Sequence, residues 1–419
     1  MNIALFTETY LPYINGVVTH VKSLKDGLER AGHKVLVVSA DIKARHHYIE
    51  NGVLWCPAKE FKRFYDYGLA SPVSLKRLRM IKRFHPDIIH IHNEFGVGLS
   101  GIAIAKILKV PLVYTLHTMY DDYLYYIAPK PLIPFVKKVS HRYFRFLGKR
   151  AAAITGPSPK VQEFLSDCGV AKEVNVVPNP VELDKFQLEC VNQDKVKQIK
   201  EQYRIQDDEL IVCFCGRLGR EKSVDVLLDY FAKTVNRDDK IRLLIIGDGP
   251  SRPELEEQAK RLHIDDVVTF TGKAAHDELV NYYACCNLYV TTSLSDTNSI
   301  SMLEAMATGL PVLHRFDKLN EGQVVMGVNG YIFYDAEDMY ATMLKYQRLP
   351  SDAKLALRHS VIESVKKSGQ ENLAKYLLDV YHHLEENSEH ERKHHGRKRK
   401  LSVYELNVFD KHSDSDEEK

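Results

Sequence analysis

Short apolar runs rich in β-branched residues alternate along the chain with longer stretches in which apolar residues recur every three or four positions. The runs predict strands, and the longer stretches predict amphipathic helices. In the first part of the chain, strands are expected at 2–6, 34–39, 87–91, 111–116 and 152–155, and helices at 17–31, 99–108 and within the basic, aromatic stretch 129–150. This alternation is typical of βα units and predicts a doubly wound parallel sheet covered by helices.

A second series of the same kind follows a short strand at 174–177 and the turn-rich segment Pro178-Asn179-Pro180. Its strands are expected at 210–215, 242–246, 267–270 and 288–291, and its helices at 223–234, 252–262, 277–284 and 300–308. Because proline removes backbone donors and stiffens a connection, we place the hinge at 178–205. The prediction is an α/β protein with two Rossmann-like, doubly wound parallel-sheet domains that face a cleft. The expected divisions are 1–180, 181–368, a closing helix at 369–384 and a disordered charged tail at 385–419.

The charge of the chain is nearly balanced but unevenly distributed. The 58 basic residues stand against 56 acidic ones, which does not suit non-specific binding to nucleic acid. Residues 1–184, however, hold 25 Lys and Arg against 16 Asp and Glu. Such asymmetry indicates an oriented contact of the first domain with another surface.

Several features bear on where the protein works. Seven scattered cysteines without a C-x-x-C pair suit reduced thiols in a cytosolic protein. Glu8 interrupts the first apolar run, so the start of the chain predicts a buried strand rather than a signal peptide. No run of about 18 apolar residues occurs, so any contact with a membrane is expected from one side. We expect a cytoplasmic protein that associates peripherally with the inner face of the cell membrane.

Two segments of the second domain carry candidate chemistry. Arg217 and Lys222 lie in a glycine-containing loop between a strand and a helix, where cations and backbone amides suit a diphosphate. Asp296 and Glu304 flank the start of a predicted helix, and Asn298 or Ser299 can cap this helix. A phosphate bound to the backbone amides of Asn298, Ser299 and Ile300 would therefore have one carboxylate on each side. Carboxylates accept hydrogen bonds from paired hydroxyls, as in a sugar and a ribose. Each segment also has a purely structural explanation. Arg217 and Lys222 would then be two solvated loop cations, and the 296–304 segment would be a helix cap followed by a surface glutamate.

The first domain offers weaker signals. Gly16 separates a strand from a helix and would let a substrate approach the backbone, although an ordinary turn explains it equally well. His117 ends a strand at the sheet edge where open α/β sheets bind ligands. His90 and His92 share a strand face, but no third ligand has suitable spacing, so we expect both to be structural and no metal to be bound. In the second domain, Gly247-Asp248-Gly249-Pro250 lacks the third glycine of a dinucleotide fingerprint and predicts only a tight turn.

The first domain also carries two basic stretches without intervening acids. The second of them interleaves its cations with aromatic and aliphatic residues, a pattern that suits anionic lipid headgroups. The alternative is a solvated helix that packs its aromatic residues inward. The cations expected to face a membrane or acceptor are Lys130, Lys137, Lys138, Arg142 and Arg145.

Together these segments resemble the family-4 retaining glycosyltransferases of the GT-B fold, over residues 1–384. The matching residues are Gly16, His117, Val177-Pro178-Asn179, Gly216-Arg217, Glu221-Lys222, Gly247-Asp248-Gly249-Pro250, and Asp296 and Glu304 with the following Ala305, Ala307, Gly309, Pro311 and Val312. The resemblance implies that Arg217 and Lys222 hold the donor diphosphate, that Asp296 contacts the donor sugar and Glu304 the ribose, and that His117 lies beside the transferred sugar. It implies no metal or other cofactor.

This sequence departs from the family pattern at a few positions. Asp296 stands where the family usually has Glu, and Pro180, Ser223 and Ser299 stand where it commonly has Gly. Because Asp is one methylene shorter, either the donor sugar sits closer or the role of this acid is weakened.

Within the family, the segments 6–12 and 115–123, which ends at Tyr123, look like those of bacterial 1,2-diacylglycerol 3-glucosyltransferases, although Tyr125 stands where those relatives have His. We therefore expect a retaining enzyme that moves a hexose, with glucose favoured, from a UDP-sugar to diacylglycerol at an anionic membrane surface. Three alternatives stay open: a mannosyl- or other hexosyltransferase acting on a different lipid or a polysaccharide precursor, a non-catalytic partner protein, and a nucleotide-sugar epimerase.

Overall fold

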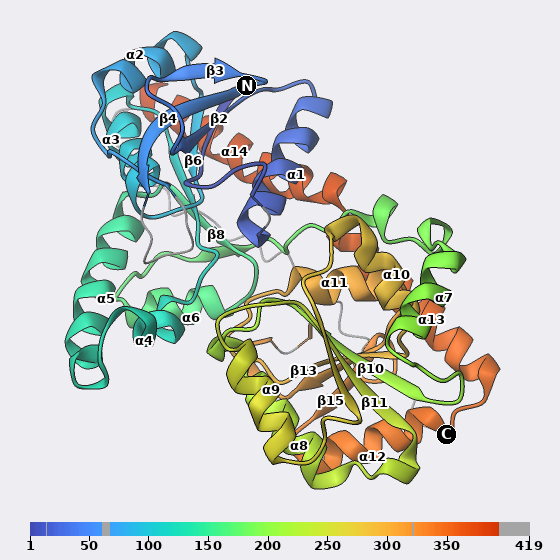
Figure 1. Cartoon of the computed structure of the whole chain (residues 1–419). Coiled ribbons are helices and arrows are strands. Elements are labelled where there is room, and N and C mark those ends of the chain that lie inside the picture. Colours follow the sequence, from blue (N-terminus) through green and yellow to red (C-terminus); the bar gives the residue numbers. More distant parts are fainter. Residues whose placement is uncertain (14, 61–67, 321, 394–419) are drawn as a thin grey trace, which may run out of the picture.

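The computed structural model describes residues 1–13, 15–60, 68–320 and 322–393 of the chain. These residues form two α/β lobes, each built around a mainly parallel sheet (Figure 1). The predicted fold class is therefore confirmed.

The first lobe contains a nine-stranded sheet in the order β3-β4-β2-β1-β6-β7-β8-β9, with β5 paired to β4. Its strands are β1 (Asn2–Phe6), β2 (Lys34–Asp41), β3 (Tyr48–Glu50), β4 (Val53–Glu60), β5 (Gly68–Ala70), β6 (Ile88–Ile91), β7 (Leu112–Thr115), β8 (Ala153–Gly156) and β9 (Val174–Val176). The strands β3 and β5 run antiparallel to β4, which corrects the expectation of a purely parallel sheet. Sequence analysis missed β3 because its three residues are all exposed and form no apolar run.

Helices cover both faces of this sheet. They are α1 (Gly16–Arg30), α2 (Leu75–Phe84), α3 (Gly96–Leu108), α4 (Leu124–Ile127), α5 (Ile133–Arg150) and α6 (Lys160–Asp167). Apolar residues of α2, α3, α5 and α6 share one core with the sheet, and those of α1 share another on the opposite face. Asn15 starts α1, because its side chain accepts a hydrogen bond from the backbone N–H of Val18 at 3.0 Å.

The second lobe contains a six-stranded sheet in the order β12-β11-β10-β13-β14-β15, and every pairing is parallel. Its strands are β10 (Leu210–Cys215), β11 (Ile241–Ile246), β12 (Val268–Gly272), β13 (Leu288–Thr291), β14 (Val312–Arg315) and β15 (Gly330–Phe333). Its helices are α7 (Gln193–Gln202), α8 (Val224–Thr234), α9 (Arg252–Arg261), α10 (Leu279–Ala284), α11 (Ile300–Ala307), α12 (Ala336–Gln347) and α13 (Ser351–Val365). The predicted hinge at 178–205 is too long, because α7 occupies its second half and packs beside α10.

The last helix, α14 (Gln370–Lys393), returns to the first lobe and lies along α1 (Figure 1). A Cβ at Gly27 of α1 would stand 2.6 Å from the Cβ of Ala374, so glycine permits this close approach. The helix runs past Leu384 to Lys393, and disorder beginning at residue 385 is therefore wrong for 385–393. The remainder of the predicted tail, 394–419, lies outside the described residues.

This topology brings the candidate residues to two sheet edges. In each lobe, the strand order reverses direction at the first strand: β1 lies between β2 and β6, and β10 lies between β11 and β13. Loops at the carboxyl ends of such strands diverge and leave room for a ligand. The residues that follow β1, β6 and β7, and those that follow β10 and β13, hold nearly all of the predicted site.

Among the described residues, no helix combines the length and the apolar character needed to cross a membrane.

Candidate active site between the lobes

Two cations of the loop after β10 each pair with a carboxylate. Arg217 Nη1 lies 3.1 Å from Glu221 Oε1, and the Lys222 ammonium is hydrogen-bonded to Asp296. Burial opposes ionisation of Asp296, but Lys222 outweighs it and holds the pKa of this carboxyl below its ordinary value. The loop thus holds two cations in fixed positions at the sheet edge, as expected, and Glu221 is a partner that sequence analysis had not assigned.

The turn after β11 supports this loop. Gly247 has φ +140°, and a Cβ there would lie 1.9 Å from the carbonyl oxygen of Gly216. The N–H of Ser251 donates to the carbonyl oxygen of Leu218 at 2.9 Å. The turn therefore packs directly against the Arg217 loop, which agrees with a structural role and leaves no space for a side chain at Gly247.

The segment 296–304 has the expected arrangement, with one difference. Ser299 is the N-cap of α11 and accepts from the N–H of Met302. Asn298 does not cap the helix: its side-chain and backbone oxygens accept from the N–H and Nδ2 of Asn179, at 2.9 and 2.7 Å. Asn298 therefore links the two lobes, and its expected contact with a donor phosphate stays a prediction.

Glu304 lies in the second turn of α11 and is almost fully buried. His276, which follows β12, contacts it through Nε2 at 2.9 Å, and the hydroxyl of Tyr283 lies 3.5 Å away. Burial raises the pKa of Glu304 despite these contacts, whereas the hydrogen bond with Glu304 raises the pKa of His276. His276 also stands 3.8 Å from Glu182, so this histidine bridges two acids. Sequence analysis missed it, and no local motif marks it.

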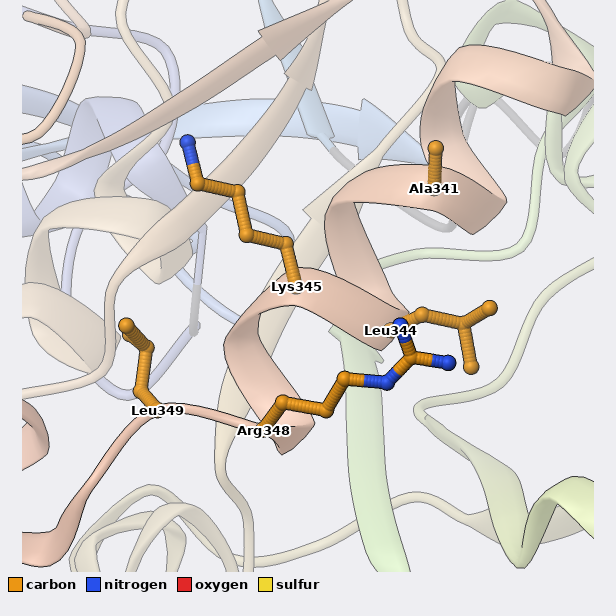
Figure 2. Close-up of a pocket in the computed structure, with 5 residues that line it drawn as sticks. All are labelled: Ala341, Leu344, Lys345, Arg348 and Leu349. Carbon is orange, nitrogen blue, oxygen red and sulfur yellow. The ribbon is translucent and has the colours of Figure 1, made fainter.

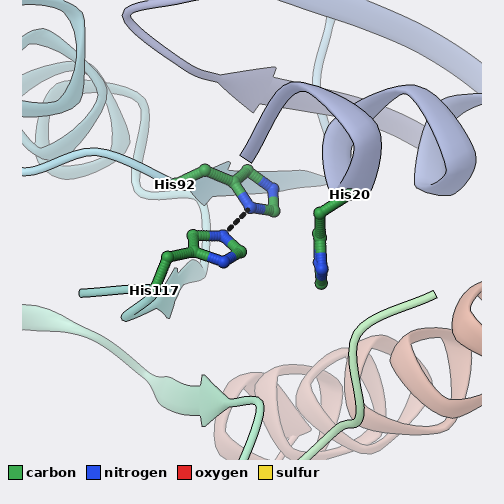
Figure 3. Close-up of side chains that lie close together, drawn as sticks. All are labelled: His20, His92 and His117. Atoms are coloured by element: carbon green, nitrogen blue, oxygen red, sulfur yellow. Dashed lines mark hydrogen bonds between the residues drawn. The ribbon is translucent and has the colours of Figure 1, made fainter. Parts of the chain in front are cut away.

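At the edge of the first lobe, His117 is not alone. It follows β7, and its Nε2 lies 3.1 Å from Nδ1 of His92, while the ring of His20 from α1 meets it edge-on, with centroids 4.7 Å apart (Figure 3). The expectation that no third histidine joins His92 is wrong, because α1 and β7 supply partners that are distant in sequence. Burial lowers the pKa of His20 to about 4 and places the pKa values of His92 and His117 well below the usual range, so all three rings are neutral at pH 7.

The ring of His90 lies beside that of His92, tilted by 33° with the centroids 4.1 Å apart, but His90 is fully buried in the core. Its ring nitrogens lie 2.6 Å from the hydroxyls of Tyr381 on α14 and Thr115 on β7. Both nitrogens are thus occupied, which agrees with the structural role expected for His90.

Two glutamates complete this edge, of which Glu94 is buried and Glu8 is partly buried. Glu8, after β1, accepts from the N–H groups of Ala70 and Val97 at 2.7 and 2.8 Å. Glu94 accepts from Tyr114 at 2.9 Å and also from Tyr120. Burial raises the pKa of each carboxyl to about 7. Their position in the loops that follow β1 and β6 was a signal in the sequence that had not been used.

The helix α5 is joined to this edge. The hydroxyl of Tyr143 donates to the backbone oxygen of Glu94, and Asp121 pairs with Lys137 at 2.9 Å and with His141 at 3.0 Å. Asp121 belongs to the segment that follows His117 and contains Tyr123. The basic helix and the histidine edge are therefore parts of one unit.

The outer face of α5 is both apolar and basic. Phe135 is 68% exposed. The other exposed apolar residues of this stripe are Leu132, Val139 and Phe146, and the exposed cations beside it include Lys130, Lys138 and Arg142. Arg145 differs, because its Nε donates to the carbonyl oxygen of Cys168 at 2.7 Å and the side chain is directed towards the end of α6. In the first of the two basic stretches, which holds Lys76, Arg77, Arg79, Lys82 and Arg83, Arg77 is buried, and this excludes it from any surface contact.

The two edges meet through contacts between the lobes. The hydroxyl of Tyr125, from the segment after β7, donates to Glu221 at 3.1 Å. Lys160 of α6 is buried and reaches Asp317 and the carbonyl oxygen of Leu294, both at 2.5 Å. A Cβ at Gly16 would stand 3.4 Å from Cδ1 of Ile300, so the start of α1 lies against the start of α11. The two edges that carry the predicted residues thus lie against each other, and their joint role as one site stays a prediction.

A shallow hollow of about 470 Å³ lies elsewhere, along α12 of the second lobe. Figure 2 shows its lining residues, Ala341, Leu344, Lys345, Arg348 and Leu349. The charged side chains are two cations that spread apart, and no acid or hydroxyl converges with them. This hollow lacks the polar groups of a catalytic site.

Comparison with known proteins agrees with this geometry. Residues 14–185 match the Glycosyltransferase Family 4 profile, and residues 195–368 match Glycosyl transferases group 1. The chain is 33% identical to Alpha-monoglucosyldiacylglycerol synthase of Streptococcus pneumoniae, over 91% of this chain and 85% of that protein. It is 27% identical to the enzyme of the same name from Acholeplasma laidlawii, over 91% and 94%.

More distant relatives include GDP-mannose-dependent alpha-mannosyltransferase of Mycobacterium tuberculosis, which is 28% identical over 75% of this chain and 78% of that protein. The crystal structure of Anabaena HepE in complex with UDP and glucose superposes with a TM-score of 0.68 at 17% identity, over 91% of this chain and 100% of that one. That likeness concerns the fold. The matches to both halves and the first relative show that this chain belongs to the family-4 glycosyltransferases of the GT-B fold.

Proposed function

We propose that the protein transfers glucose from UDP-glucose to diacylglycerol at the cytoplasmic face of a membrane, with retention of the anomeric configuration. The names of the two most similar relatives given above support the glucosyl group and the lipid acceptor. The observation that carries the proposal is the attachment of α5, with its exposed apolar and basic face, to the edge that holds His117. A lipid acceptor needs such a connection between a membrane surface and the reacting centre.

The ion pairs of the second lobe support a diphosphate donor. Arg217 and Lys222 are held at the sheet edge by Glu221 and Asp296. A bound diphosphate would form ion pairs with these two cations, partly in place of the two acids. Preorganised cations stabilise charge that develops on a leaving group. The buried Glu304 would accept hydrogen bonds from the ribose, with His276 holding the carboxylate in place.

The transfer exchanges one bond for another at the anomeric carbon. The bond from this carbon to the diphosphate oxygen breaks, and the acceptor hydroxyl oxygen bonds to the carbon on the same face. The hydroxyl proton passes to an oxygen of the departing diphosphate, so UDP leaves and no protein base is consumed. His117, which is neutral, would hydrogen-bond the sugar rather than remove a proton.

Binding to the membrane would use the outer face of α5. The exposed apolar side chains of Phe135, Val139 and Phe146 are spaced by four and seven residues, which places them on one face of the helix, and Leu132 directly precedes it. Cations beside such a face contribute about 1 kcal/mol each at an anionic surface. The structure thus offers an amphipathic helix that can lie in the membrane plane.

The central test is a transfer assay. The full chain is incubated with radiolabelled UDP-glucose and diacylglycerol in anionic vesicles, and the label in the lipid phase is counted. We expect label in a single lipid product, and NMR of its anomeric proton to show the α configuration. Label that remains aqueous with a folded protein would refute the lipid acceptor, and a β product would refute retention.

The membrane contact has its own test, vesicle co-sedimentation. Phe135→Ser with Val139→Ser should weaken binding to anionic vesicles about tenfold, because two exposed apolar anchors are lost. Leu355→Ser is the matched control, since Leu355 is similarly exposed at 56% but lies on α13 of the second lobe. Equal loss of binding in both variants would contradict the assignment to α5.

A mannosyltransferase is the second candidate, supported by the relative that uses GDP-mannose. The same assay with radiolabelled GDP-mannose separates the two donors. Faster transfer from GDP-mannose than from UDP-glucose would replace the first proposal with the second.

A further inference from the structure

Three histidines from separate parts of the first lobe meet at its carboxyl edge. They are His20 on α1, His92 directly after β6 and His117 after β7 (Figure 3). One ring nitrogen of each lies within 4.8 Å of those of the other two. His20 and His92 are each 1% exposed, whereas His117 is partly exposed and gives access from the side of the cleft.

Two nitrogens of this cluster have no partner. Within the described part of the chain, Nε2 of His20 and Nε2 of His92 are buried and make no hydrogen bond. Buried polar atoms are nearly always satisfied, so each such atom calls for an explanation. For Nε2 of His20 a bound cation is such an explanation, because an imidazole nitrogen that lacks a donor can offer its lone pair to a metal.

The surroundings of His20 resemble those of a metal ligand. Its Nδ1 lies 3.2 Å from Oδ1 of Asn179, and Nδ2 of Asn179 donates to the backbone oxygen of Asn298, which fixes the orientation of the amide. Since Oδ1 can only accept, Nδ1 of His20 carries the proton and Nε2 presents its lone pair. Metal-binding histidines are commonly oriented in this way through their second nitrogen.

We propose that His20, His92 and His117 form a binding site for a divalent transition-metal ion of the Zn²⁺ class. Three imidazoles with one open position are a known Zn²⁺ ligand set. Zn–N bonds of about 2.0–2.1 Å in tetrahedral geometry separate ligand nitrogens by roughly 3.3 Å. Nδ1 of His92 and Nε2 of His117 already stand 3.1 Å apart, so His92 would bind through Nδ1, and a rotation of His20, whose ligand atom lies within 4.8 Å of both, would complete the set. His90 is excluded because both of its nitrogens are bonded.

The ion would use a residue that the transfer reaction needs. If the proposed function holds, His117 contacts the sugar, and a metal on the same ring would compete with it. The site would therefore inhibit transfer rather than assist it. This consequence rests on the proposed function, whereas the binding of the ion does not.

The test is metal titration of the full chain after treatment with a chelator. Co²⁺ should bind at one ion per chain with the intense visible absorption of a four-coordinate site, and Zn²⁺ should displace it. His20→Gln and His92→Gln should each weaken Zn²⁺ binding at least about tenfold, measured against a chromophoric chelator. Circular dichroism confirms that each variant is folded.

Two controls address other histidines. His141→Gln removes a first-lobe histidine outside the cluster, and His394→Gln with His395→Gln removes a pair in the C-terminal region. Both should leave the tight binding unchanged. The proposal is overturned if the tail variant abolishes binding, or if the absorption is that of a six-coordinate ion.

A third variant, Asn179→Ala, removes the oxygen that orients His20 and should weaken binding less than loss of His20 itself. Transfer assays separate the two proposals. Failure of Co²⁺ to bind while glucose transfer proceeds refutes the metal site alone. Tight binding without transfer from any donor refutes the function and leaves the metal site standing.

Discussion

The two sheet edges that form the site handle charge in opposite ways. On the second lobe, cations and acids are paired: Lys222 with Asp296, Arg217 with Glu221, and His276 with Glu304. On the first lobe, burial favours the neutral forms of His117 and Glu94, and no opposite charge compensates within hydrogen-bond distance among the described residues. The edge of the second lobe therefore holds its charged groups as ion pairs, whereas at the edge of the first lobe burial favours the neutral forms of His117 and Glu94.

This difference fits the two partners of a glycosyl transfer. A diphosphate is an anion, and it can replace the acids that hold Arg217 and Lys222 without leaving a cation uncompensated. A sugar and a lipid hydroxyl are neutral, and an uncharged edge can approach them without the cost of desolvating an ion. The comparison can be tested by changing the charge on either edge.

The largest effect is expected from Lys222→Met. The variant loses one of the two cations proposed to bind the diphosphate and leaves Asp296 as a partly buried carboxylate without its ammonium, so kcat/KM should fall about 100-fold or more. Arg220→Met is the matched control, because Arg220 lies in the same loop with a side chain 65% exposed and only a 3.6 Å contact to Glu254. Adding Asp296→Asn to Lys222→Met should restore the unfolding temperature but not the activity. Retention of a third of the activity in Lys222→Met would contradict the role of this pair.

A smaller effect, on stability, is expected from the neutral edge. The pKa of Glu94 is raised to about 7, so the folded state binds a proton that the unfolded state releases, and stability falls as pH rises from 5.5 to 8. The fall due to this residue should be about 2 kcal/mol, and Glu94→Gln should remove it. Urea unfolding followed by the fluorescence of Trp55, which lies in the first lobe on β4, measures it. Glu163→Gln, at an exposed acid of the same lobe, should leave the pH dependence unchanged; a Glu94→Gln variant with the original slope would show that Glu94 is ionised.

His117→Gln should lower kcat about tenfold, because the proposed hydrogen bond to the transferred sugar is weakened, with a donor KM within about twofold of the original. Since burial keeps the pKa of His117 well below the usual range, the pH profiles of the two proteins between 6 and 8 should be parallel. If kcat of the original protein changed with pH near 6.5 and this change were absent from the variant, the His117 ring would titrate and the first-lobe edge would not be neutral.

The smallest change is expected at His276. Its hydrogen bond with Glu304 raises the pKa of His276 and lowers that of Glu304, so His276→Ala should let Glu304 protonate at a higher pH. The donor KM should rise about fivefold, close to 1 kcal/mol, and the increase should grow as pH falls from 8 to 6. His276→Gln keeps a donor and should recover most of the affinity. A pH-independent rise in KM would indicate lost packing instead.

Sequence analysis predicted the donor side of the site better than the acceptor side. Arg217, Lys222, Asp296 and Glu304 lie in two short segments whose strand-loop-helix pattern fixes their positions, and the structure brings these segments together. The roles assigned to them in binding stay predictions. The first-lobe edge was less predictable, because His20, His92 and His117 come from three strand–helix units, and their proximity depends on strand order.

The alternation of apolar runs and amphipathic stretches by itself determined two parallel-sheet lobes, since hydrophobic period and turn residues act locally. Only the tertiary structure decided that α14 returns to the first lobe, that Asn298 binds Asn179 rather than a helix end, and that three histidines share one corner. These outcomes depend on which strands are neighbours and on which groups lose water. Neither property is encoded within any short segment of the chain.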